Sequence, residues 1–144
     1  TRPELGADIR GRLDLGVLFP ATAYIKAQRV RRYLQESFRE TFKTVDVLVT
    51  PTLPITAPRR DATSVSIDGV SMPVVPALTR LTRLYNFLGL PAITVPCGFS
   101  QEGLPIGLQI AGKPFAEATI LRVAQAHEAN TDWHKKEPPL PRVE

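Results

Sequence analysis

Apolar residues recur every three or four positions in three stretches of the chain, the spacing of a helix with one buried face. The longest stretch predicts a helix over residues 22–44. Its core-facing stripe is Ala23, Ala27, Val30, Leu34, Phe38, Thr41 and Val45. A second stretch predicts a helix over residues 75–88 that ends at Gly89, since glycine readily adopts the left-handed backbone of a helix C-cap. A third helix is predicted over residues 115–130.

The two ends of the chain carry weaker patterns. Residues 1–20 mix charged and apolar positions, and we expect Gly11 and Gly16 to limit any helix in this lead-in to short pieces. Residues 135–144 form a proline-rich tail with little apolar surface to bury. The organisation therefore predicts one domain over the whole chain, with its core formed by the segments in between.

Short apolar runs bounded by proline and glycine predict the strands. One runs over residues 46–50 and is closed by Pro51. Residues 63–72 predict a hairpin, because Asp-Gly at its centre is a strong turn signal. Two further strands, over residues 92–95 and 106–110, complete a helix-strand-strand unit that extends to residue 112. The alternation of helices and strands predicts the α/β class, with a mixed sheet flanked by helices.

Composition and charge exclude several classes of protein. The 144 residues are 43% hydrophobic, and no apolar run is long enough to cross a bilayer. The net charge of +4 is mild, and acidic residues dilute the basic stretch from Arg29 to Lys43, so we expect neither nucleic-acid nor membrane binding. The single cysteine, Cys97, cannot form an internal disulfide, which favours the cytoplasm.

No catalytic constellation is visible in the chain. A nucleophile needs a nearby base and donors for the developing oxyanion. All nine glycines are isolated, and the G-x-S-x-G, Walker A and G-x-G-x-x-G motifs are absent. His127 lies on the apolar side of its predicted helix and is interpreted as structural, while His134 and Cys97 lack zinc-site spacing. We therefore expect no catalytic residue, no metal and no cofactor within this chain.

The most constrained segment is residues 86–112, in which three prolines and five glycines punctuate two apolar runs. Such a segment is a scaffold or one wall of a site. The polar residues in and before it that could face a cleft are Thr79, Thr82, Asn86, Thr94 and Gln109. Each of them also has a simple alternative role in local capping or loop hydrogen bonding.

These residues resemble the C-terminal part of the amidase-signature family, serine hydrolases that cleave carboxamide C–N bonds. The matching pieces are Asn86, Gly89-Leu-Pro-Ala92, Val95-Pro96, Gly98-Phe99, Gly103-Leu-Pro-Ile-Gly-Leu-Gln109 and Gly112. Asp46-Val-Leu-Val-Thr-Pro-Thr52 upstream and Pro114-Phe115 downstream also fit. The resemblance spans nearly the whole chain in order.

The resemblance implies a mixed sheet surrounded by helices, and a catalytic lysine and two serines that lie upstream of everything seen here. None of those three residues can be placed on this chain. Thr79, Thr82 and Asn86 become candidates for the lining of the substrate pocket. Relatives that act on glutamine carry an aspartate three positions before the threonine that matches Thr82. Thr79 stands there in this chain, which argues against a glutamine amidotransferase.

Three hypotheses remain open at this point. The chain is the C-terminal portion of an amidase, inactive by itself, with the N-terminal part as its partner and a small carboxamide as the substrate of the complete enzyme. Alternatively, it is a non-catalytic scaffold or binding module retained from an amidase. Weak nucleic-acid binding through residues 29–43 is the third. The first hypothesis predicts self-association through unpaired strand edges, whereas the second predicts a self-contained monomer.

Overall fold

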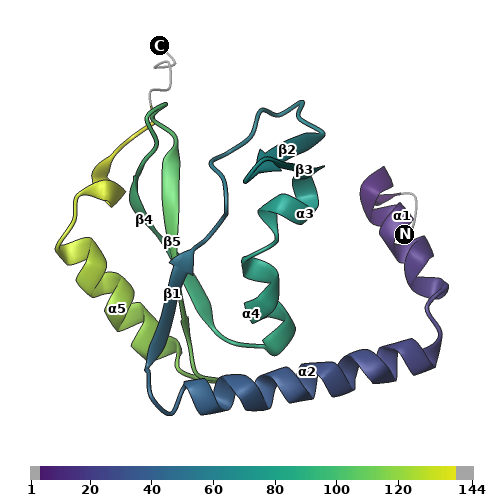
Figure 1. Ribbon diagram of the computed structural model, residues 1–144. Coiled ribbons are helices and arrows are strands. Elements are labelled where there is room, and N and C mark those ends of the chain that lie inside the picture. Colours follow the sequence, from purple (N-terminus) through teal and green to yellow (C-terminus); the bar gives the residue numbers. More distant parts are fainter. Residues whose placement is uncertain (1–3, 139–144) are drawn as a thin grey trace. The chain divides into compact units, whose positions relative to one another are not determined.

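The computed structural model describes residues 4–138, without the side chains of residues 7 and 8. The chain divides into two units, one up to Phe38 and one from Arg39 onward. Each unit is described separately. The first contains helix α1 (Ala7–Val17) and most of helix α2 (Ala21–Thr41), and the second contains all the strands (Figure 1).

The lead-in is more helical than its glycines suggested. Helix α1 runs without a break through Gly11 and Gly16, so the expectation of short pieces only was wrong. Glycine lowers helix stability by about 1 kcal/mol relative to alanine, but it does not block the hydrogen-bond ladder as proline does. A Cβ built on either glycine meets no atom within 4 Å.

Helix α2 confirms the long predicted helix but ends at Thr41, three residues early. Residues 42–44 form a turn instead, in which the N–H of Lys43 donates to the carbonyl of Glu40 at 3.0 Å. The helix holds no buried residue. Within its predicted core-facing stripe, Leu34 and Phe38 are half-buried, whereas Val30 is 48% exposed.

The second unit is built on a three-stranded antiparallel sheet. Strand β5 (Pro105–Gly112) lies between β1 (Val47–Pro51) and β4 (Ala92–Phe99). Thr50 stands opposite Gln109 in one ladder, and Thr94 stands opposite the same glutamine in the other. The α/β class is confirmed, although every ladder in the described residues is antiparallel where a mixed sheet was expected.

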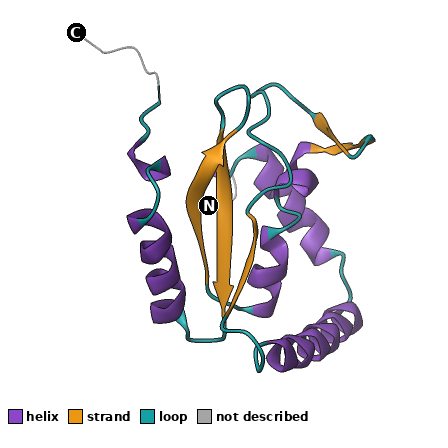
Figure 2. Ribbon diagram, turned by 60° about the vertical axis from the view of Figure 1, so that its left-hand side comes forward, coloured by secondary structure: helices purple, strands orange, loops and turns teal. Residues whose placement is uncertain are grey.

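The core lies between the sheet and helix α5 (Glu117–Ala129). Its buried members come from two strands and this helix: Val95, Ile110, Ile120 and Ala124. Helix α5 lies on one side of the sheet and helix α4 (Thr82–Leu88) on the other (Figures 1 and 2). Gly112 lets α5 approach closely, because a Cβ there would meet Cγ2 of Ile120 at 2.8 Å.

The predicted hairpin is present as β2 (Ser64–Ile67) and β3 (Val70–Pro73), which pair antiparallel. Its two turn residues have positive φ angles, 50° at Asp68 and 79° at Gly69. A two-residue turn of this kind needs left-handed backbone at both positions, which explains the Asp-Gly signal.

The helix predicted over residues 75–88 is broken in two. Helix α3 (Val74–Leu78) ends at Thr79, whose hydroxyl donates back to the carbonyl of Val75 at 2.9 Å, and α4 begins at Thr82. The N–H of Thr79 donates to the same carbonyl at 3.1 Å, and the N–H of Arg80 then donates to the carbonyl of Ala77 at 3.2 Å, a tighter bond of the kind found at helix ends. The expected end of α4 at Gly89 is confirmed by its φ of 72°.

Strand β4 is longer than predicted and continues through Pro96, with a bulge between Pro96 and Gly98. The Pro96 carbonyl lies 3.0 Å from Nε2 of the half-buried His127, which confirms the structural interpretation of this histidine. The predicted tail begins in a 3₁₀ turn (Trp133–Lys135). Residues 139–144 lie outside the described residues.

Candidate functional site

A pocket of about 390 Å³ opens at the end of the sheet where β1 finishes and β5 begins. Ligand pockets in proteins typically have volumes of 300–1,000 Å³. Ten described residues line this one: Thr52, Leu53, Pro54, Ile55, Thr56, Ala57, Thr94, Pro105, Ile106 and Gly107. None of these ten carries a charge.

Two threonines and one glycine form a compact cluster in this pocket. Thr52 Oγ1 donates to Thr94 Oγ1 at 3.2 Å, and the N–H of Thr52 donates to the carbonyl of Gly107 at 2.9 Å. A Cβ on Gly107 would meet Thr52 Oγ1 at 2.8 Å and Thr94 Cγ2 at 2.9 Å. Only glycine therefore fits on β5 between the two threonines.

A polar row continues the cluster across the sheet. Gln109 is 3% exposed, and its Nε2 donates to Thr50 Oγ1 at 3.2 Å. Side chains alternate between the faces of a strand. Val95 and Ile110 point into the core beside α5, so the neighbouring Thr94 and Gln109 belong to the opposite face. The row is uncharged, and side-chain hydrogen bonds join Gln109 to Thr50 and Thr52 to Thr94.

The structure places the three residues predicted for the pocket lining elsewhere than around this pocket. Thr79 accepts a hydrogen bond of 2.6 Å from Nη2 of Arg83, and Thr82 Oγ1 lies 3.5 Å from the Thr79 carbonyl. Asn86 is exposed one turn further along α4. Thr79, Thr82 and Asn86 thus form a separate strip on the α3–α4 segment, and their predicted role stays a prediction.

Of the other polar positions singled out in the sequence, Thr94 lines the pocket and Gln109 lies in the row beside it. Sequence reasoning missed Thr52 as a member of this site. The sequence does mark Thr52, because Thr50-Pro51-Thr52 closes a predicted strand. Its contacts in the pocket, Thr94 and Gly107, are however 42 and 55 positions away along the chain.

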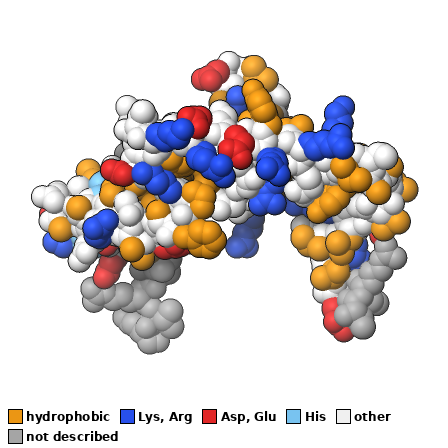
Figure 3. All heavy atoms as spheres, turned by 90° about the horizontal axis from the view of Figure 1, so that it is seen from below, with side chains coloured by type: hydrophobic (Ala, Val, Ile, Leu, Met, Phe, Trp, Pro, Cys, Tyr) orange, Lys and Arg blue, Asp and Glu red, His pale blue; other side chains and the backbone are white. Residues whose placement is uncertain are grey.

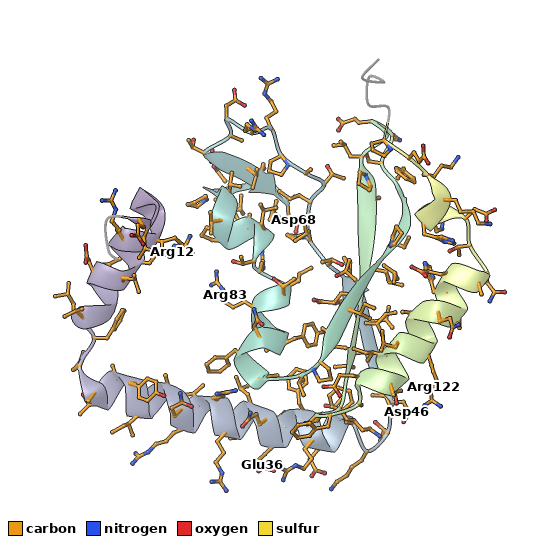
Figure 4. The ribbon with its side chains drawn as sticks, turned by 180° about the vertical axis from the view of Figure 1, so that it is seen from behind. Arg12, Glu36, Asp46, Asp68, Arg83 and Arg122 are labelled. Atoms are coloured by element: carbon orange, nitrogen blue, oxygen red, sulfur yellow. The ribbon has the colours of Figure 1, made fainter. Side chains whose placement is uncertain are left out.

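The charged residues of the second unit form no candidate metal centre in the described part of the chain. No group of three or more His, Cys, Asp or Glu side chains stands close enough to hold a metal. Arg83 on α4 and Arg122 on α5 lie on different sides of the sheet (Figure 4). Asp132 lies far from the pocket lining in the sequence. Its pKa is lowered by a hydrogen bond from the Lys135 side chain and by the charge of Lys135.

The basic stretch of the sequence lies on helix α2. Figure 3 shows its Lys and Arg side chains gathered along this helix, with apolar side chains between them. Lys43 just beyond the helix pairs with Glu40 at 2.7 Å, both side chains being largely exposed.

Of the helices that the structure describes, none combines the length and apolar character needed to cross a membrane.

Comparison with known proteins places the chain in a family. The model of the family described as Amidase matches residues 3–121. The chain belongs to the amidase family. The resemblance noted in the sequence is thereby confirmed, and it covers every residue of the pocket and of the polar row.

Three relatives illustrate the match. A fatty acid amide hydrolase from Medicago truncatula is 47% identical over 135 residues, which are 94% of this chain and 22% of the relative. An amidase from Pseudomonas putida is 44% identical over 140 residues, 96% of this chain and 30% of the relative. A solved structure from a vestigial protein complex, which bears on the origins of an s-triazine catabolic enzyme, superposes with a TM-score of 0.82.

That structure is 29% identical to this chain, and the match covers 90% of this chain and 28% of the solved one. The chain therefore spans between a fifth and a third of the length of the relatives it matches. It is an amidase-family segment and corresponds to part of the complete enzymes.

Proposed function

We propose that this chain supplies scaffold strands and part of the substrate pocket of a hydrolase that cleaves carboxamide C–N bonds, and that it is inactive by itself. The observation that carries the proposal is the family match over residues 3–121 in a chain that spans 22–30% of its curated relatives. The polar groups at the pocket support it, since threonine hydroxyls bonded to one another offer no activated nucleophile.

The hydrogen bonds of His127 and Ser100 support the same proposal. His127 contacts the Pro96 carbonyl through Nε2, and Ser100 Oγ accepts hydrogen bonds from the N–H groups of Glu102 and Leu104. Both side chains thus stabilise local structure. In the complete enzyme, the remaining part of the amidase domain would then be the partner that supplies the reacting groups.

Ammonia release from simple carboxamides tests this proposal. The chain alone should release none. A chimera that joins the N-terminal part of the Pseudomonas putida amidase to residues 1–144 should release ammonia, and the N-terminal part alone is the matched control. Turnover by the 144-residue chain alone, retained at constant specific activity through repurification, would refute the proposal.

The strip formed by Thr79, Thr82 and Asn86 retains its proposed role in the substrate pocket of the complete enzyme. Thr82 and Asn86 stand one helical turn apart and share a face of α4. Asn86→Ala in the chimera should lower kcat/KM for small carboxamides. Arg80→Ala, at an exposed position outside the strip, is the control.

The alternative, a non-catalytic module retained from an amidase, is favoured by one observation. The second unit has a core of its own in which β5 is paired on both sides and α5 covers one face. A sharp cooperative melt and a monomer in sedimentation would support the module. Self-association through the free edges of β1 and β4 would support the amidase portion instead.

We also propose the cytoplasm as the compartment of the complete protein. Cys97 is free and half-buried, which suits a reducing environment. Cell fractionation of the host with an antibody against the chain tests this placement.

A further inference from the structure

Arg83 on helix α4 carries a positive charge that no carboxylate of the described residues neutralises. Its side chain is exposed, and none of the ion pairs in the described part of the chain includes it. The sequence offers no acidic neighbour either, because residues 69–101 contain two arginines, Arg80 and Arg83, and neither aspartate nor glutamate. The α3–α4 segment is therefore a locally positive surface.

A hydrogen bond holds the guanidinium of Arg83 in place. Its Nη2 donates to Thr79 Oγ1 at 2.6 Å, and the same hydroxyl donates to the Val75 carbonyl at 2.9 Å. A guanidinium has five N–H donors in a planar fork that matches the two oxygens of a carboxylate. Because one nitrogen is already tethered to Thr79, the fork is partly oriented before a ligand arrives, which lowers the entropy lost on binding.

Arg83 shares a face of the α3–α4 segment with the strip of Thr79, Thr82 and Asn86. It stands four positions after Thr79 and three before Asn86, the spacings that bring side chains together on a helix. Figure 4 shows its side chain pointing from α4 away from the three-stranded sheet. The strip therefore combines hydroxyl and amide groups with one uncompensated positive charge.

We propose that Arg83 binds a carboxylate group of the substrate, so that the complete enzyme prefers a carboxamide that also carries a carboxylate. The inference rests on the proposed function for the carboxamide and for the place of the strip in the substrate pocket. What it adds is the charge of the second group. A carboxylate there gains charge-assisted hydrogen bonds from the guanidinium, whereas an ammonium group meets a like charge.

Three small amides that differ in one terminal group test the inference in the chimera. Succinamate carries a carboxylate, succinamide a neutral amide of the same shape, and 3-aminopropanamide an ammonium group. The readout is the ratio of kcat/KM for succinamate to kcat/KM for each carboxamide group of succinamide. This ratio should exceed one, and 3-aminopropanamide should have the lowest kcat/KM. If the chimera cleaves none of the three, their Kd values for the chimera replace kcat/KM in the same comparison.

Three variants locate the effect. Arg83→Gln should lower the ratio about tenfold or more, the usual effect of losing hydrogen bonds to a charged group. Arg83→Lys keeps the charge without the planar fork and should retain only part of the preference. Arg80→Gln is the matched control, since Arg80 is also exposed on this segment but lies outside the strip, and it should preserve the ratio.

An equal loss for succinamate and succinamide in Arg83→Gln would overturn the inference, because it would make Arg83 an ion-pair residue toward the remaining part of the amidase. A ratio of one in the unmodified chimera, or an equal fall in Arg80→Gln, would do the same. A chimera that cleaves no amide but binds succinamate more tightly than succinamide would support the inference and count against the proposed hydrolase.

Discussion

The close approach of helix α5 to strand β5 gives the sharpest prediction for stability. Gly112 and the buried Ile120 are the two residues at the contact. A Cβ on Gly112 would lie 2.8 Å from Cγ2 of Ile120, with Ala116 Cβ the next atom at 3.5 Å. Because the φ of Gly112 is not in the left-handed region, replacing it with alanine introduces a steric conflict without backbone strain.

The magnitude follows from two opposing terms. Forcing an additional methyl group into a packed core costs about 1–3 kcal/mol. Alanine also restricts the unfolded chain, which stabilises the folded state by about 0.4–1 kcal/mol where the backbone is compatible. Gly112→Ala should therefore lower the free energy of unfolding by roughly 0.5–2 kcal/mol, since the steric term is the larger.

Replacing Ile120 by leucine isolates the steric term. Leucine lacks the β-branched methyl group Cγ2 that causes the conflict, and such volume-conserving exchanges cost less than about 1.5 kcal/mol. Urea unfolding followed by circular dichroism gives the free energy for the four members of the double-mutant cycle. Gly112→Ala should be nearly neutral in the Ile120→Leu background. An equal loss in both backgrounds would refute the steric account.

Three smaller changes test other parts of the structure. Gly16→Ala should raise the helicity seen by circular dichroism, stabilising α1 by about 1 kcal/mol, and reduced helicity would contradict the open surroundings of this residue. His127→Phe should destabilise the chain by about 0.5–1.5 kcal/mol in urea unfolding, because the Pro96 carbonyl loses its donor. The pKa of Asp132 is lowered from the ordinary value of 3.8 by Lys135, so the ion pair stabilises the 3₁₀ turn fully at any pH above 3.8. This stabilisation is lost as the pH falls through the lowered pKa of Asp132. Trp133 fluorescence should change in that acidic range and stay constant in Asp132→Asn.

The sequence predicted those elements that depend on local chemistry. The hairpin followed from Asp68 and Gly69, which adopt the positive φ angles that the turn requires. The end of α4 followed from Gly89 for the same reason. The break between α3 and α4 was not predicted, because the apolar spacing continues through Thr79 and no glycine marks the end of α3.

The candidate site was predictable only in part, because strand register assembles it. Thr94 and Gln109 were recognised as polar residues within apolar strands. Nothing in the local sequence indicates that β5 lies between β1 and β4, which is what brings these residues together. Thr52 joins the pocket through a contact with Gly107, 55 positions later in the chain. Thr79, Thr82 and Asn86 were singled out as polar residues and assigned to the pocket lining through the family resemblance, whereas the pocket itself is visible only in the fold.

The central place of β5 also determines which backbone amides of the second unit exchange their hydrogens most slowly. Its ladder is shared with β1 on one side and β4 on the other, and the segment from Gln109 to Gly112 is buried throughout. An amide in this segment can exchange its hydrogen with solvent only when the sheet opens as a whole, whereas amides on the outer edges of β1 and β4 exchange through local fraying. The slowest-exchanging amides of the second unit should therefore lie in β5, whose exchange rate measures the global stability of this unit.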